Sequence, residues 1–219
     1  MSNNHQGYVS AIAIGLFEPI FRLIENLQSI DPIEPNEVQT GSQENGYSCG
    51  IIVLSVLLLE SAINRTRYLR EGKVDRHPNS NKYFSDIIND KSLSSHVEEI
   101  YTVRDAIVHN HLWTGKVDWT KNKGLSFVSS PKLIEGFGNT RFRKLLDTKS
   151  RQTKTLGLNL FPPRIWRKDA YTVFSITFNS LLALEKLDRN YFYISDQYFR
   201  FNDRIQKLQE IIHSLDDTV

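Results

Sequence analysis

The chain has 219 residues, 40% of them hydrophobic and 24% charged, which is the composition of an ordinary globular protein and suits a single domain. A formal net charge of only +2 excludes a uniformly basic or acidic chain, whose overall charge alone would indicate its partners. Cys49 is the only cysteine, which excludes an intramolecular disulfide, fits a reducing compartment and leads us to expect a cytoplasmic protein.

The first part of the sequence predicts two helices joined by a loop. Apolar residues recur every three or four positions over residues 8–30, which indicates a helix that is bent or begins near Pro19. Residues 31–46 contain two prolines and an acidic bias, and predict a loop. Residues 47–70 predict the most hydrophobic helix. Its apolar run, 51–59, has about half of the roughly 20 residues that a membrane span needs, so we expect a core helix and no membrane.

Two more helices are predicted before residue 112. Residues 81–90 indicate a short helix, and Ser95 and Glu98 have the spacing of a capping box at the start of the next one. Four helices connected by short loops predict an antiparallel helical bundle. Helical periodicity returns at residues 169–187 and again at 197–215, so the predicted fold class is all-α.

The region 114–168 differs from the helices on both sides. Residues 117–119 and 125–128 indicate two short strands around a turn. Residues 116–168 contain 13 Lys and Arg against three Asp and Glu, an excess of ten positive charges, so the rest of the chain sums to −8. We therefore interpret 114–168 as a small, basic, partly β insertion in a single domain that spans residues 1–219.

One predicted helix carries an unusual group of polar side chains within eight residues: Arg104, Asp105, His109, Asn110 and His111. An Arg guanidinium binds phosphate oxygens in a forked geometry, and a His can give and take a proton near neutral pH. Together they can cleave RNA without a metal, with the neighbouring 2′-hydroxyl as the nucleophile. The alternative is that Arg104 and Asp105 are solvated and that the histidines cap the end of the helix.

Other catalytic signatures are absent from the sequence. It contains no P-loop, no dinucleotide glycine fingerprint, no nucleophile elbow and no HExxH zinc helix, and it lacks acidic pairs at metal-ligand spacing. We therefore expect neither a metal nor another cofactor.

Helix geometry constrains how the polar group could act. At about 100° per residue, Arg104 and His109 lie roughly 140° apart around a regular helix, whereas Arg104 and His111 differ by roughly 20°. A joint site with His109 needs the long reach of Arg, a loosened last turn, or a second protomer that brings its own Arg and His to a shared cleft. A symmetric pair has the further advantage that it supplies two acid/base groups.

The sequence from Arg104 to His109 resembles the R-[N/D/H]-x3-H form of the R-x4–6-H motif of HEPN domains, and it lies late in a bundle of about four helices, as in that family. The tail 110–113 resembles some bacterial HEPN branches. The resemblance implies a HEPN-like homodimer whose two motifs meet in one groove and cleave RNA without a metal. Family members act in toxin–antitoxin pairs and in phage defence, which implies an antitoxin or a defence-system partner. Other members are inactive and only bind RNA or proteins.

The resemblance also implies individual roles. Arg104 would hold the phosphate, His109 would be the acid/base and Asp105 would orient one of them. Because the family allows spacings up to six, His111 stays open as the alternative acid/base. Asn110 would contact RNA or complete the helix end.

Two candidates lie outside the motif. Glu60 either pairs with Arg104 and fixes its guanidinium or faces solvent at the rim of the bundle. The densest basic cluster, Arg141, Arg143 and Lys144, is our candidate for contacts with RNA phosphates, with a plain solvated loop as the alternative.

Overall fold

The longest helix of the computed structural model is α3, Gln43–Glu71, and the other helices pack around it. The structure describes residues 14–32, 42–72, 79–109, 113–114, 117–120, 124–127, 132–133, 140–189 and 193–216. The hydroxyl of Ser42 begins α3 by accepting a hydrogen bond from the N–H of Asn45, and Gly72 ends it with φ at +66°. Both caps fit their residues, since Ser satisfies an unpaired N–H and Gly takes a positive φ without steric cost.

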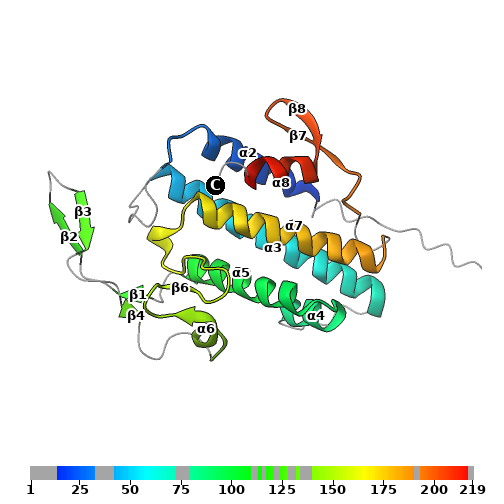
Figure 1. Cartoon of the computed structure of the whole chain (residues 1–219), viewed down its shortest axis with the longest axis horizontal. Helices are drawn as coiled ribbons and strands as arrows, with labels where there is room; N and C mark the ends of the chain where they lie inside the picture. The colour runs from blue at the N-terminus through cyan, green and yellow to red at the C-terminus, as the bar shows by residue number, and fades with distance from the viewer. Residues whose placement is uncertain are drawn as a thin grey trace, which may run out of the picture.

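Three further long helices complete the bundle: α2, Phe17–Gln28; α5, Lys91–His109; and α7, Arg167–Leu187. These four helices alternate in direction along the chain, so α3 and α7 run parallel and lie side by side (Figure 1). The short α4, Ser80–Ile87, packs on α3 and α5, and α8, Leu208–Asp216, packs on α7. The described chain is mostly helical with a few small strands, which confirms the all-α class.

The core forms where the apolar stripes of the helices meet. Helix α2 buries residues spaced three or four apart, namely Phe17, Ile20, Phe21, Ile24 and Leu27. The ring of Phe21 makes edge contacts with Phe174 of α7 and with Phe201, at centroid distances of 6.1 and 5.8 Å. Because full burial of such a side chain stabilises a fold by about 1.5–3 kcal/mol, these contacts fix α2 against the bundle.

Helix α3 is central to the bundle, but it is not buried on every side. By its length and composition, α3 could cross a membrane. In the structure, 50% of its most apolar stretch is buried. The central helix of a bundle meets the same criteria, and α2, α4, α5 and α7 all pack on α3. Leu57, within the run predicted to be core, is nevertheless 46% exposed.

The predicted insertion at residues 114–168, which we call the basic segment, runs from the end of α5 into the start of α7 (Figure 1). The two strands predicted around a turn are confirmed as β2 and β3, which pair antiparallel with Val117 opposite Phe127. The elements of this segment are β1 Trp113–Thr114, β2 Val117–Thr120, β3 Gly124–Phe127, β4 Lys132–Leu133, α6 Thr140–Leu145, β5 Leu146–Asp147, β6 Gln152–Thr153 and the 3₁₀ helix η1 Pro162–Arg164. Strand β1 pairs with β4, and β5 pairs with β6, both antiparallel.

Buried polar side chains tie the basic segment to the bundle. Glu99 of α5 is fully buried, and its two carboxylate oxygens accept the backbone N–H groups of Thr155 and Leu156, each at 2.9 Å. The amide nitrogen of Asn45 in α3 donates to the carbonyls of Pro162 and Ile165, both at 2.8 Å. The loop after β6 and η1 are therefore held on two different helices of the bundle.

Three local predictions were wrong. Residues 43–46, predicted as part of a loop, form the first turn of α3. Residues 197–215 do not form one helix: they form a hairpin of β7, Tyr198–Phe201, and β8, Arg204–Lys207, followed by α8. Asn202 and Asp203 make the turn with φ at +48° and +57°, and Asn and Asp are the side chains that best tolerate this backbone. Helix α5 begins before the proposed capping box, because the carboxylate of Asp90 accepts the N–H of Leu93.

Asp169 lies in the first turn of α7, and its carboxylate is buried. It accepts the backbone and side-chain N–H groups of Asn159, both at 3.0 Å, and the backbone N–H of Trp166 at 3.1 Å. Burial raises the pKa of Asp169 to about 6, although these hydrogen bonds favour the charged form and oppose the shift.

This raised pKa predicts a pH-dependent stability. Between the ordinary value of 3.8 and the folded value of about 6, the folded protein binds more protons at Asp169 than the unfolded chain does. The contribution of this group is therefore fully present below the ordinary value and is lost as the pH rises through about 6. We expect urea titrations from about pH 4 to about pH 7 to show wild-type stability falling relative to Asp169→Asn. A difference that does not change with pH would contradict the raised pKa.

Candidate functional site

Arg104 lies on a partly exposed face of α5, where three side chains surround its guanidinium. Its Nη2 lies 3.4 Å from Oε2 of Glu60 in α3, and its Nε lies 3.0 Å from Oδ1 of Asp105. The guanidinium carbon is 5.4 Å from the ring centre of Tyr101, one turn earlier in α5. Nε is buried and its N–H makes no hydrogen bond to a described residue, so Asp105 is near it without being aligned. The long bond to Glu60 engages one side of the fork, and a guanidinium has further N–H donors for an anion.

For Glu60, the structure shows the pairing with Arg104 rather than an isolated solvent-facing side chain. The side chains of Arg104 and Glu60 are 25% and 31% exposed, so solvent screens their attraction. Tyr101 was not singled out in the sequence, although its spacing of three residues from Arg104 places both on one helix face. Glu60 and Tyr101 thus fix the direction of the guanidinium without neutralising it fully.

His109 is exposed and is the last residue of α5, which is α-helical up to this position. The last turn is therefore not loosened between Arg104 and His109, and their separation of roughly 140° holds. The guanidinium lies with Tyr101 and Glu60, which are on the side of the preceding turn. Within this chain, Arg104 and His109 therefore do not form a joint site through a loosened last turn or through a guanidinium that extends toward the His.

Two exposed apolar side chains lie next to the Arg104–Glu60 pair. Leu57, three residues before Glu60, is 46% exposed, and Val108, four residues after Arg104, is 54% exposed. Residues three or four apart share a helix face, and α3 and α5 run in opposite directions (Figure 1). Leu57 and Val108 therefore lie on the same side of the pair. We call Leu57, Glu60, Arg104 and Val108 the motif face.

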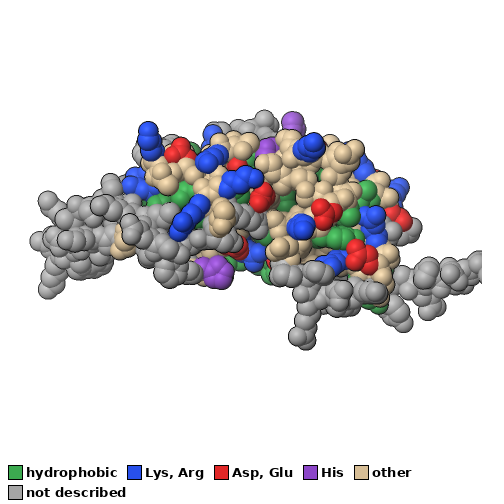
Figure 2. Space-filling model, turned by 90° about the horizontal axis from the view of Figure 1, so that it is seen from below, with side chains coloured by type: hydrophobic (Ala, Val, Ile, Leu, Met, Phe, Trp, Pro, Cys, Tyr) green, Lys and Arg blue, Asp and Glu red, His purple; other side chains and the backbone are tan. Residues whose placement is uncertain are grey.

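The remaining predicted residues are only partly described. Asn110 and His111 lie outside the described residues, so the choice between His109 and His111 stays open. The side chain of Arg141 also lies outside them, whereas Arg143 and Lys144 are exposed at the end of α6. On the face shown in Figure 2, Lys and Arg side chains lie on the left, the side where Figure 1 places the basic segment, and also on the right.

Not every cation of the basic segment is available to a ligand. Arg167 donates its backbone N–H and its guanidinium to the buried carboxylate of Glu44, at 3.1 to 3.2 Å. The exposed cations among the described side chains of this segment are Arg143, Lys144, Lys149, Lys154 and Lys168. Some cations of this segment therefore stabilise the fold, and others are exposed and can bind polyanions.

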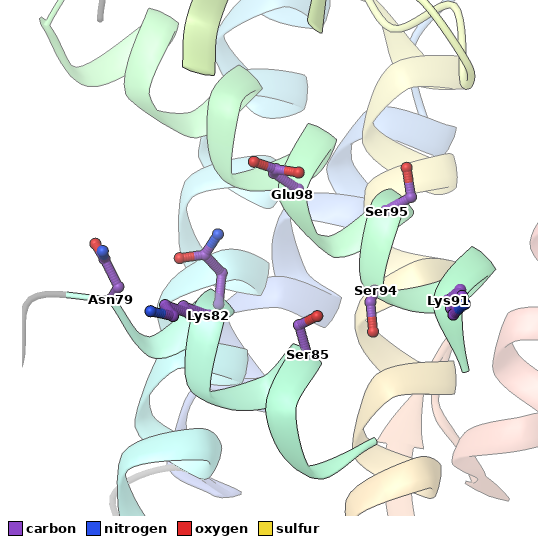
Figure 3. A pocket seen from close by; sticks show the side chains of 8 residues that line it. Asn79, Lys82, Ser85, Lys91, Ser94, Ser95 and Glu98 are labelled. Carbon is purple, nitrogen blue, oxygen red and sulfur yellow. The ribbon is translucent and has the colours of Figure 1, made fainter. Parts of the chain in front are cut away.

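A cavity of about 440 Å³ lies between α4 and the first turns of α5 (Figure 3). Its walls are polar and carry both signs of charge, being lined by Asn79, Asn81, Lys82, Ser85, Lys91, Ser94, Ser95 and Glu98. None of the predicted site residues is among them. Within the described ranges, no group of three or more His, Cys, Asp or Glu side chains is placed to hold a metal ion.

We expect the Arg104–Glu60 pair to contribute little to stability. Because both side chains are partly exposed, Glu60→Ala should lower the free energy of unfolding by less than about 1 kcal/mol. Glu44→Ala is the matched control: Glu44 is 0% exposed, and leaving Arg167 unpaired should cost about 3–5 kcal/mol. Chemical denaturation measures both values. Equal decreases in stability would mean that Arg104 is a structural link between α3 and α5 instead of a surface site.

Comparison with models of protein families, with curated proteins and with solved structures finds no match to this chain. Its function must therefore be inferred from its own residues. The features that bear on function are a partly exposed guanidinium, an exposed imidazole five residues later, and a basic segment that begins where their helix ends.

Proposed function

We propose that this chain is a metal-independent endoribonuclease of HEPN type, in which Arg104 and His109 of two protomers act together in a groove between them. The observation that carries the proposal is the motif face. Arg104 is directed by Glu60 yet remains partly exposed, and exposed apolar side chains lie next to it. Charged groups that serve only the interior of a fold are paired and buried, whereas Arg104 can reach a ligand.

A second copy of the chain accounts for the exposed apolar residues. In a two-fold dimer the same patch of each subunit faces its counterpart, so Leu57 and Val108 of both copies would be buried together. Burial of each such side chain would favour association by about 1.5–3 kcal/mol at most. The contact would also bring two copies of Arg104 and His109 into one groove, which a single regular helix cannot do.

The chemistry of such a groove is cleavage by the neighbouring 2′-hydroxyl. One His takes the proton of the 2′-hydroxyl, whose oxygen attacks the phosphorus, and the other His protonates the departing 5′-oxygen. The products are a 2′,3′-cyclic phosphate and a 5′-hydroxyl end. Arg104 stabilises the charge that grows on the phosphate, and Asp105 orients either Arg104 or His109. His111 is the alternative acid/base, and Asn110 contacts the RNA.

The exposed cations of the basic segment extend this site. Arg143 and Lys144, with Arg141, would hold RNA phosphates beyond the cleavage point. A nuclease of this kind must be restrained in its own cell, which agrees with a toxin controlled by an antitoxin or with a phage-defence component. The second candidate is an inactive RNA-binding or protein-interaction module of the same fold.

We expect purified protein to cleave RNA in the presence of EDTA, and the cleavage rate to fall by at least about a hundredfold in Arg104→Ala and in His109→Ala. His213→Ala is the matched control, because His213 is an exposed His on α8 and its removal should leave the rate unchanged. Gel analysis of the fragments, with detection of the cyclic phosphate, gives the measurement.

Each result of this assay discriminates between the candidate functions. RNA binding by all variants without cleavage by any of them would favour the inactive module. If His111→Ala abolishes cleavage while His109→Ala retains it, the acid/base role moves to His111. Failure of both Arg104→Ala and His109→Ala to fold would favour a scaffold in which these residues only stabilise the bundle.

The dimer makes a separate prediction. We expect sedimentation to show a dimer for the wild type and a monomer for Leu57→Glu and Val108→Glu, because a buried unpaired carboxylate opposes association. Ile205→Glu is the control: Ile205 is the most exposed large apolar side chain of the described surface and lies on β8, away from the motif face. A wild-type monomer, or dimers that persist in both variants, would refute the shared groove.

A further inference from the structure

Two arginines of the basic segment lie at Phe161, and neither has a carboxylate partner among the described residues. The backbone N–H of Arg164 donates to the carbonyl of Phe161 at 2.9 Å. Arg151 is the last residue of the turn between β5 and β6, and Arg164 ends η1. The guanidinium carbon of Arg151 lies 5.9 Å from the ring centre of Phe161. Nε of Arg164 is buried and makes no hydrogen bond to a described group. Burial lowers the pKa of Arg151, and the nearby charge of Arg164 lowers it further, so the two guanidiniums repel each other.

The backbone at Arg151 is also unfavourable. Its φ is +61°, a left-handed conformation in which a side chain normally meets steric hindrance and which glycine adopts most readily. Two unfavourable features thus coincide at Arg151: a strained backbone and an uncompensated like charge. Such features persist where the surrounding structure imposes them, and they cluster at sites that bind ligands.

The surrounding structure does impose them. The loop after β6 is fixed to α5 by Glu99, and η1 is fixed to α3 by Asn45. Phe161, beneath Arg151, packs edge-on against Trp113 at 5.9 Å, and the indole N–H of Trp113 donates to the carbonyl of Leu160. The two arginines are therefore held on rigid supports before any ligand arrives, and Trp113 follows His109 by only four residues.

We propose that Arg151 and Arg164 form an anion site that takes a phosphate of an RNA backbone. Two forked guanidiniums match the oxygens of a phosphate, and the charge of the phosphate would remove the repulsion between them. The exposed Lys149, Lys154 and Lys168 of the same segment favour an extended polyanion over a free phosphate ion. The site rests on the proposed function only in that RNA is its ligand, since it requires no cleavage.

The test measures binding of a labelled single-stranded RNA in EDTA at several salt concentrations, in a background that carries both His109→Ala and His111→Ala and so lacks both candidate acid/base groups. Arg151→Asn and Arg164→Gln should each weaken binding about tenfold, as expected when a hydrogen bond to a charged group is removed. Each should also reduce the slope of log K against log salt by about 0.7 for each phosphate that the variant no longer neutralises. Arg204→Gln, at an exposed arginine of β8, removes the same charge elsewhere and should change neither value.

A purely structural role would give a different pattern. Asn tolerates a positive φ, so Arg151→Asn should keep or raise the melting temperature while RNA binding falls. Variants that bind RNA as tightly as Arg204→Gln would overturn the proposal. So would tight binding of inorganic phosphate, abolished by both substitutions, together with unchanged binding of RNA. Absence of cleavage by the wild type would defeat the nuclease but not this site, because binding is measured independently.

Discussion

The largely buried ion pair between Glu44 and Arg167 is the interaction on which the arrangement of the chain depends. Arg167 gives Glu44 three donors and also donates to the carbonyl of Ile30. Breaking such a pair strands a charge in the interior, so the first turns of α3 and α7 must begin together. The chain leaves the bundle at the end of α5 and must return to this same place. The basic segment therefore begins and ends at the end of the bundle where α5 ends, and between these points part of it lies along α5 (Figure 1).

The regularity of α5 is the second constraint, and it decides what the motif can do. A helix that stays regular to His109 presents Arg104 and His109 in different directions, so one chain cannot close a hydrogen-bonded pair between them. The exposed Leu57 and Val108 matter for this reason. In the proposed dimer they would supply the apolar contact, next to a guanidinium that is surrounded by Glu60, Asp105 and Tyr101. The proposed RNA cleavage and the proposed dimer thus both depend on the motif face.

Local periodicity was enough to predict the long helices and the β2–β3 hairpin, because each is encoded by residues near in sequence. It failed at residues 198–207, where the spacing of Phe201 and Ile205 fits a helical stripe but Asn202 and Asp203 form a tight turn. The sequence left two alternatives for Glu60, pairing with Arg104 or facing solvent. The apolar run of α3 predicts that this helix is central, but it does not predict which part of α3 contacts α5. The contacts of Glu44 and Glu99 join residues 123 and 56 positions apart, and no local pattern encodes them.

The arginines of this chain differ in how completely carboxylates compensate them, and the difference follows where each one lies. Arg167 is largely buried and paired with Glu44, so it serves the fold. Arg104 is partly exposed and shares one long hydrogen bond with Glu60, so it is oriented but still able to bind. Arg151 and Arg164 lack a carboxylate among the described residues, and burial together with the nearby charge of Arg164 lowers the pKa of Arg151. In the function and the anion site that we propose, Arg151 and Arg164 hold an RNA phosphate, and Arg104 acts on the phosphate that is cleaved.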